Sequence, residues 1–290
     1  MHWLELFQHN PNLLYGLIAI VGLTVGSFLN VVIYRLPKML DEDWRRECAA
    51  LMGKEDAVQE RPRMSLAYPS SHCPHCGHRL RPIENIPLMS YLVLRGRCSA
   101  CNASISLRYP LVEATTALLS VLVVGRFGLG WESAAALVLT WGLIALAAID
   151  LETKLLPDAI TLPLLWLGLL LSLGGWPTDS RSAILGATLG YAFLWAVFHL
   201  FRLLTGKEGM GFGDFKLFAL FGAWLGWQYL PQIILLSACA GALAGAALLL
   251  RGRDSQIPIP FGPYLAMAGW VGLMWGEAIN CTYLQWAGLI

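Results

Sequence analysis

The stretch "ESAAALVLTWGLIALAAID" (132–150) decides the fold, because it carries no charge between Glu132 and Asp150. A helix rises about 1.5 Å per residue, so about 20 apolar residues cross the hydrocarbon core of a bilayer. Inside lipid the backbone groups of a spanning segment must bond to one another, which excludes an isolated strand. The stretch therefore predicts a membrane-spanning helix that ends on an acid.

The rest of the chain supports a membrane protein. Its 290 residues are 57% hydrophobic and 13% charged, with a mean hydropathy of +0.58, whereas soluble domains are about 25% charged. We expect an all-α polytopic membrane protein with about eight transmembrane helices. The expected spans are residues 12–34, 110–126, 131–150, 158–176, 182–204, 215–230, 231–250 and 261–279.

The basic residues predict an orientation. Residues 1–12 contain no Lys or Arg, so the first span is expected to be a retained helix and not a cleaved signal peptide. If the N-terminus lies outside, the loops at 35–109, 151–157, 202–216 and 251–260, with the span ends, hold 18 of the 20 Lys and Arg residues; Arg126 and Arg181 lie outside. Basic residues concentrate on the cytoplasmic side of membrane proteins, which favours this topology. The net charge of +1 gives no indication of nucleic-acid binding.

Residues 35–109 form the one loop long enough for a water-exposed domain. We therefore divide the chain into a first helix (1–34), a small cytoplasmic domain (35–109) and a seven-helix core (110–290). A domain this small needs a staple beyond its own core. Within it, residues 41–60 mix acids and bases and are expected to form a solvated helix or a mobile segment, or alternatively an acidic docking surface.

Two Cys-x-x-Cys knuckles, "CPHC" (73–76) and "CSAC" (98–101), lie in this loop. Four thiolates at this spacing are typical of a structural zinc site, which would stabilise the domain. A redox pair or unrelated cysteines are the alternatives, although a reducing cytoplasm argues against disulfides. We expect Cys73, Cys76, Cys98 and Cys101 to be the zinc ligands. The histidines at 72, 75 and 78 are expected in supporting or exposed positions.

A second acid mirrors Asp150. In "GFGDFKL" (211–217), Asp214 opens the sixth expected span from the same side on which Asp150 closes the third. An acid at the membrane boundary is a functional-site hypothesis, and each aspartate is the best candidate partner of the other. Two carboxyl groups in a partly dry site can divide the roles of general acid and general base. A helix N-cap at Asp214 and an ion-relay pair in a transporter remain alternatives.

Residues around the two acids are candidates for holding a substrate. Gly211 and Gly213 would let a backbone approach closely, while Lys216 is expected either to offset negative charge or to meet a lipid phosphate. Glu113 lies one turn inside the second span, which indicates a bonded role facing the bundle. The run "PFGP", with Pro260, Gly262 and Pro263, is expected to offer backbone groups to an extended peptide, or to be a simple turn.

Together these motifs resemble the prepilin peptidases, a family of membrane aspartic proteases with a Gly-x-Gly-Asp signature. The resemblance runs in order from the first helix to the last. The matching stretches are "GSFLNVVIYRLP" (26–37), the two knuckles, "NIPLMSYLVLRGRC" (85–98), "RYPLVE" (108–113), "AIDLETKLLPD" (148–158), "GMGFGDFKLFA" (209–219) and "PIPFGPYLA" (258–266).

This resemblance implies that Asp150 and Asp214 are catalytic. It implies a multi-pass protein of the bacterial inner membrane that cleaves basic leaders, after Gly, from type IV prepilins and pilin-like type II secretion proteins. It further implies methylation of the new N-terminus with S-adenosylmethionine, for which Gly96 and Arg97 are the candidates. Cleavage without methylation and ion-coupled transport are the alternatives. Neither the pilins that are processed nor the oligomeric state follows from the sequence.

Overall fold

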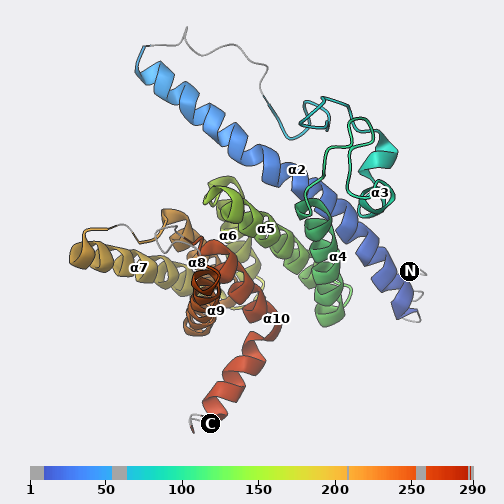
Figure 1. The fold of residues 1–290 in the computed structure, drawn as a ribbon. Coiled ribbons are helices and arrows are strands. Elements are labelled where there is room, and N and C mark those ends of the chain that lie inside the picture. Colours follow the sequence, from blue (N-terminus) through green and yellow to red (C-terminus); the bar gives the residue numbers. More distant parts are fainter. Residues whose placement is uncertain (1–9, 54–63, 208, 253–258, 287, 289–290) are drawn as a thin grey trace. The chain divides into compact units, whose positions relative to one another are not determined.

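A computed structural model of the chain describes residues 10–53, 64–207, 209–252, 259–286 and 288. Its regular elements in this part are all helical (Figure 1), and two isolated bridges pair His72 with Arg79 and Arg97 with Ser104. The long helices are α2 (Pro11–Leu51), α4 (Arg108–Phe127), α5 (Trp131–Thr153), α6 (Asp158–Ser172), α7 (Ser180–Thr205), α8 (Phe212–Leu225), α9 (Leu230–Leu250) and α10 (Gly262–Trp286); the short ones are η2 (Pro82–Asn85), α3 (Met89–Val93) and η3 (Trp227–Tyr229).

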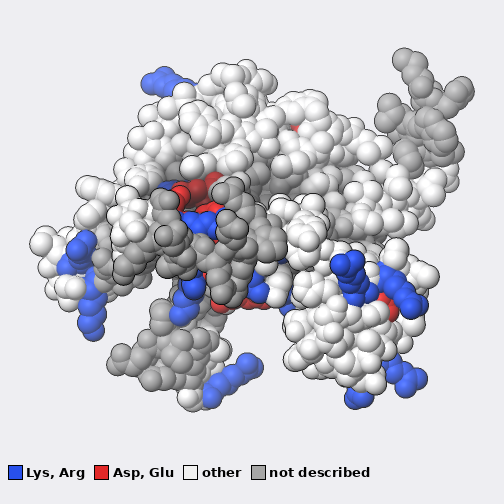
Figure 2. All heavy atoms as spheres, turned by 90° about the horizontal axis from the view of Figure 1, so that it is seen from above, with Lys and Arg blue, Asp and Glu red and all other residues white. Residues whose placement is uncertain are grey.

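The all-α membrane class is confirmed. Each of the eight expected spans overlaps one long helix, although the span expected at 215–230 runs past the end of α8 into η3. Five helical segments are long and apolar enough to cross a bilayer: α2, α4, α5, α7 and residues 227–250. Many large apolar side chains on these helices are exposed, and Figure 2 shows broad areas of surface that carry no charge. Lipid is the natural partner for such a surface. The span count of eight stays a prediction.

The first helix is longer than expected. Helix α2 does not end near residue 34 but continues past Pro37 to Leu51. The extension is rich in helix-forming residues, and it carries ion pairs one turn apart, Arg45 with Asp41 at 2.9 Å and Arg46 with Glu42 at 4.0 Å. Most of its side chains are exposed. This confirms a solvated helix up to Leu51, whereas residues 54–60 of that expectation lie outside the described part.

The contacts divide the chain into two units, residues 1–141 and 142–290, and each is described by itself. In the first unit α2 packs on α4 through two glycines. A side chain at Gly22 would lie 2.6 Å from the Cα of Ala117, and one at Gly26 would lie 2.7 Å from the Cα of Glu113. Such close backbone approach is how helices associate in membranes, where no hydrophobic effect drives them together.

A buried arginine ties the knuckle segment, the described residues 64–107 between α2 and α4, to α2. Arg35 is 7% exposed, and its guanidinium donates to the carbonyls of Ser65 (2.9 Å), Leu66 (3.3 Å) and Pro69. A buried charge is tolerated only when its hydrogen bonds are satisfied, and these carbonyls satisfy several donors. Arg35 therefore anchors residues 65–69 on the helix.

Helix α8 is the core of the second unit. From Leu217 to Leu225 every residue is buried, and α6, α7 and α10 all contact α8. The contact with α7 is the tightest, because a side chain at Gly186 or at Gly222 would overlap the backbone of the other helix. Asp214 stands at the start of this helix, so the core of the unit sets its position.

Candidate functional site

Asp150 lies in the last turn of α5 and is 5% exposed. Its Oδ2 accepts the backbone N–H of Gly262 at 3.0 Å. Gly262 is the first residue of α10, and the first N–H groups of a helix lack an intrahelical acceptor. The Asp150 carboxylate therefore caps α10 from another helix, which fixes the orientation of the acid and also favours its negative charge at that helix end.

Asp214 lies in the first turn of α8 and is 7% exposed. Gly211 is the N-cap of this helix, and a side chain at Gly211 would lie 3.8 Å from Oδ2 of Asp214. The alternative interpretation of Asp214 as the N-cap is therefore wrong, because the cap position falls three residues earlier. Burial of a charged carboxyl group costs free energy. The buried position of Asp214 therefore supports the hypothesis that it belongs to a functional site.

The segments that carry the two aspartates meet at one residue. Leu156, in the connection between α5 and α6, links them sterically. A side chain at Gly213 would lie 2.7 Å from the Cβ of Leu156, and one at Gly262 would lie 3.2 Å from its Cδ2. The structure thus brings together the neighbours of both acids around one leucine.

Two of the other candidates around the acids have definite partners. Lys216 forms an ion pair with Asp158 that the sequence did not predict. Pro263 is the second residue of α10, a position that suits proline. Of the "PFGP" run, Gly262 reaches Asp150 directly, whereas Pro260 precedes the helix.

Glu113 has a bonded role, but in the first unit. It is 8% exposed and accepts the N–H of Leu88 at 2.8 Å. Leu88 has a φ of 57°, an unfavourable conformation for a leucine, and the bond stabilises the turn. Glu113 therefore links α4 to the knuckle segment, and its place near a substrate stays a prediction.

The four knuckle cysteines form one cluster, with their sulfur atoms within 4.8 Å of one another. The Sγ atoms of Cys73 and Cys101 are 3.8 Å apart, and those of Cys76 and Cys98 are 4.0 Å apart. Four thiolates at about 2.3 Å from a tetrahedral zinc ion are separated by about 3.8 Å, so the donor set fits zinc. Backbone N–H groups of Cys76 and His75 lower the pKa of Cys73 to about 7. For Cys101 the backbone N–H of Ala103 is outweighed by the neighbouring thiols and by burial, which raise its pKa to about 12; the geometry of the cluster therefore carries the zinc assignment.

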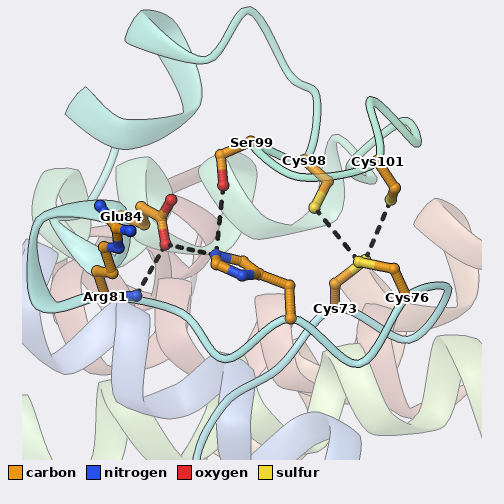
Figure 3. A network of polar contacts seen from close by, with 8 residues as sticks. Cys73, Cys76, Arg81, Glu84, Cys98, Ser99 and Cys101 are labelled. Atoms are coloured by element: carbon orange, nitrogen blue, oxygen red, sulfur yellow. Dashed lines mark hydrogen bonds and ion pairs between the residues drawn. The ribbon is translucent and has the colours of Figure 1, made fainter.

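A polar network joins the two knuckles beside the cysteines (Figure 3). Nε2 of His78 lies 3.2 Å from Glu84 and 3.4 Å from Ser99. The Arg81 backbone N–H, then Ser99 and His78, lower the pKa of Glu84 to about 2, so Glu84 is ionised at neutral pH. Both contacts use the same ring nitrogen, which excludes the relay of a catalytic triad. His78 has the supporting position expected of it.

Gly96 and Arg97 form part of the turn before the second knuckle. Gly96 has a φ of 68°, and a side chain there would lie 2.8 Å from the Tyr91 hydroxyl. Arg97 pairs with Ser104 in an isolated bridge. These contacts explain both residues by packing, and their part in methylation stays a prediction. A separate cavity of about 490 Å³ lies near the first knuckle, lined by Ala67, Tyr68, Pro69, Ser70, His72, Gly77 and Arg79.

Comparison with known proteins gives consistent matches over most of the chain. Residues 20–127 match the sequence model described as "Bacterial Peptidase A24 N-terminal domain", and residues 137–246 match the "Type IV leader peptidase family". The chain is 55% identical over 270 residues to the prepilin leader peptidase/N-methyltransferase of Pseudomonas aeruginosa, covering 93% of each chain. Proteins with the same name from Stutzerimonas stutzeri and Aeromonas hydrophila are both 53% identical, the first over 98% of this chain and 99% of its own, the second over 97% of each. No solved structure matches the chain.

Proposed function

Because the chain belongs to the type IV leader peptidase family, we propose that it cleaves the basic leader, after Gly, from prepilins and pilin-like secretion precursors. We propose further that it then methylates the new N-terminus. The observation that supports cleavage best is that Asp150 and Asp214 are both more than nine-tenths buried, in segments that meet at Leu156.

The pair supplies what peptide hydrolysis needs without a metal or a covalent intermediate. Two carboxyl groups in a site of low dielectric do not both ionise easily, so they share one proton. The ionised carboxylate takes a proton from a water molecule, which attacks the scissile carbonyl. The protonated one donates to the leaving amide nitrogen. Gly262 orients Asp150 by its hydrogen bond, so that acid is in place before substrate binds.

The orientation that we propose has the N-terminus outside and the knuckle segment in the cytoplasm. The sided distribution of basic residues supports this. Asp150 at the end of α5 and Asp214 at the start of α8 then lie at the cytoplasmic boundary of the membrane, where a short basic leader ahead of an apolar helix would present its cleavage point.

The test of both activities is one assay. Membranes containing the protein are incubated with a pilin precursor and S-adenosylmethionine that carries a labelled methyl group. We expect a product shortened by the leader and then labelled on its new N-terminal residue. A shortened product without label would support cleavage alone, and an intact precursor would contradict the proposal.

The first cofactor that we propose is a zinc ion bound by the four cysteines, which stabilises the fold of the knuckle segment and takes no part in catalysis. Replacing Cys73 with Ser removes one ligand from a closed tetrahedral set, so we expect bound zinc to fall by at least about tenfold. Methylation should fall at least as much as cleavage. Zinc content of the purified protein is the readout, and the exposed Cys48 replaced with Ser is the control. Equal zinc in both variants would contradict the site.

S-adenosylmethionine is the second cofactor, and its sulfonium would supply the methyl group. We propose that it binds in the cavity near the first knuckle. A volume of about 490 Å³ lies within the range of small-molecule sites, about 300–1,000 Å³. Arg79 offers a cation for the carboxylate of the donor, and Tyr68 offers an aromatic face for its adenine. Arg35 holds the carbonyl of Pro69, in the wall of this cavity, on α2.

Replacing Arg79 with Gln should weaken binding of S-adenosylmethionine by about tenfold or more, since a charge-assisted bond is lost. Equilibrium binding to the purified protein, with no pilin present, is the measurement. The matched control is Arg81→Gln, two residues on and outside the cavity lining, which should bind normally. Normal binding by the Arg79 variant would place the methyl donor elsewhere.

A further inference from the structure

Leu156 holds a central position between the segments of the two aspartates. It lies in the connection between α5 and α6 and is only partly exposed. Its side chain packs against Gly213, the residue before Asp214, and against Gly262, which binds Asp150. A side chain at Gly213 would overlap Leu156, and one at Gly262 would overlap Asp150 and lie 3.2 Å from Leu156. A shift of the connection would therefore move the surroundings of both acids.

An ion pair fastens the same connection to α8. Nζ of Lys216 lies 2.7 and 2.6 Å from the two carboxylate oxygens of Asp158. Lys216 follows Asp214 by two residues, and Asp158 follows Leu156 by two residues. The pair thus joins α8, two residues after Asp214, to the first residue of α6.

This ion pair contributes too little to the stability of the fold to explain its presence. The Lys216 side chain is 31% exposed and that of Asp158 is 50% exposed, and exposed ion pairs contribute little to the free energy of unfolding. Breaking it should leave the protein folded. The position of the pair, two residues from Asp214, indicates a role in catalysis. A shift of about 1 Å in a catalytic group can lower the rate about a hundredfold.

We propose, on the basis of the peptidase activity proposed above, that Lys216 and Asp158 are positioning residues for cleavage. Their ion pair holds the α5–α6 connection, with Leu156, against α8. It thereby keeps the carboxyl groups of Asp214 and Asp150 in the relative position that cleavage requires. Lys216 therefore acts through Asp158, and not by contact with a substrate or a lipid phosphate as its sequence position had indicated.

The test is a double-mutant cycle on precursor cleavage by the full-length protein. The variants are Asp158→Asn, Lys216→Gln and the two together, with Lys216→Arg as the conservative change. We expect each single change to lower kcat about tenfold, with a KM that changes less than about threefold. The double variant should be no more than about twofold slower than the worse single variant. Lys216→Arg should keep most of the rate, since Arg also pairs with a carboxylate.

The controls separate this inference from the proposed activity. Asp41→Asn breaks another exposed pair, with Arg45 on α2, and should cleave normally. Losses in the two single variants that multiply to about a hundredfold in the double variant would overturn the positioning role, because the two residues would then act independently. Single variants with wild-type rates would also overturn it. Failure of the wild-type protein itself to cleave would instead remove the proposed function.

Discussion

Replacing Asp214 with Asn should lower leader cleavage by about a thousandfold or more and abolish labelling of the pilin. Asn has nearly the same shape as Asp but cannot exchange a proton with water or with a leaving amide, so general acid–base catalysis is lost. Methylation disappears with cleavage, because the amine that receives the methyl group is not released. Asp150→Asn should give the same result, since the two acids act as a unit.

The measurement is the mass of the pilin product, together with its methyl label, after incubation with membranes that hold equal amounts of each variant. Asp41→Asn, at an exposed position on α2, is the matched control and should process the precursor normally. An unfolded variant would mislead, so each must insert and elute as the wild-type protein does in detergent. Wild-type cleavage by a properly inserted Asp214→Asn variant would refute the peptidase mechanism.

Replacing Gly262 with Ala should lower cleavage by about a hundredfold. The added carbon would lie 2.6 Å from Oδ2 of Asp150 and 3.2 Å from Cδ2 of Leu156, closer to the oxygen than such atoms approach one another. Asp150 is 5% exposed, so it has little free space in which to move. We expect the hydrogen bond from the Gly262 N–H to break and the carboxylate to turn away.

Backbone strain does not explain this effect, because Gly262 does not have a positive φ and alanine suits a helix start sterically. The matched control is Gly241→Ala on α9, where the added carbon would meet Tyr264 at an ordinary 3.5 Å. The control should retain cleavage within about twofold of wild type, by the usual scale of neutral surface changes. Equal cleavage by both variants would show that the contact of Gly262 with Asp150 has no part in the reaction.

The sequence predicted the helices well because lipid imposes a simple rule. A predominantly apolar run of about 20 residues must be helical in a bilayer, and each of the eight expected runs overlaps a long helix. The sequence predicted that α2 ends at residue 34, where the apolar run ends, but the helix continues to Leu51. Apolarity marks the end of the membrane span and not the end of the helix. A helix that leaves the membrane can continue in water on propensity and on pairs such as Asp41 with Arg45.

The sequence also indicated the cysteine cluster, because the Cys-x-x-Cys spacing restricts the possible ligands. It indicated the two acids because each lies at the end of an expected span. Partners that depend on side-chain packing were missed. Arg35 binds backbone carbonyls of residues 65–69, and Glu84 joins His78; neither leaves a periodic signal. Lys216 was singled out, but its partner Asp158 lies 58 positions away.

The sequence by itself determined the membrane class, the order of the helices, the four metal-ligand candidates and the two candidate acids, since each follows from composition or local spacing. Only the tertiary structure decided what surrounds the acids: the N–H of Gly262 on Asp150, and Leu156 between two glycines. These contacts join residues from different helices. They depend on which faces of those helices meet, and that is set by side-chain volumes summed over the whole core.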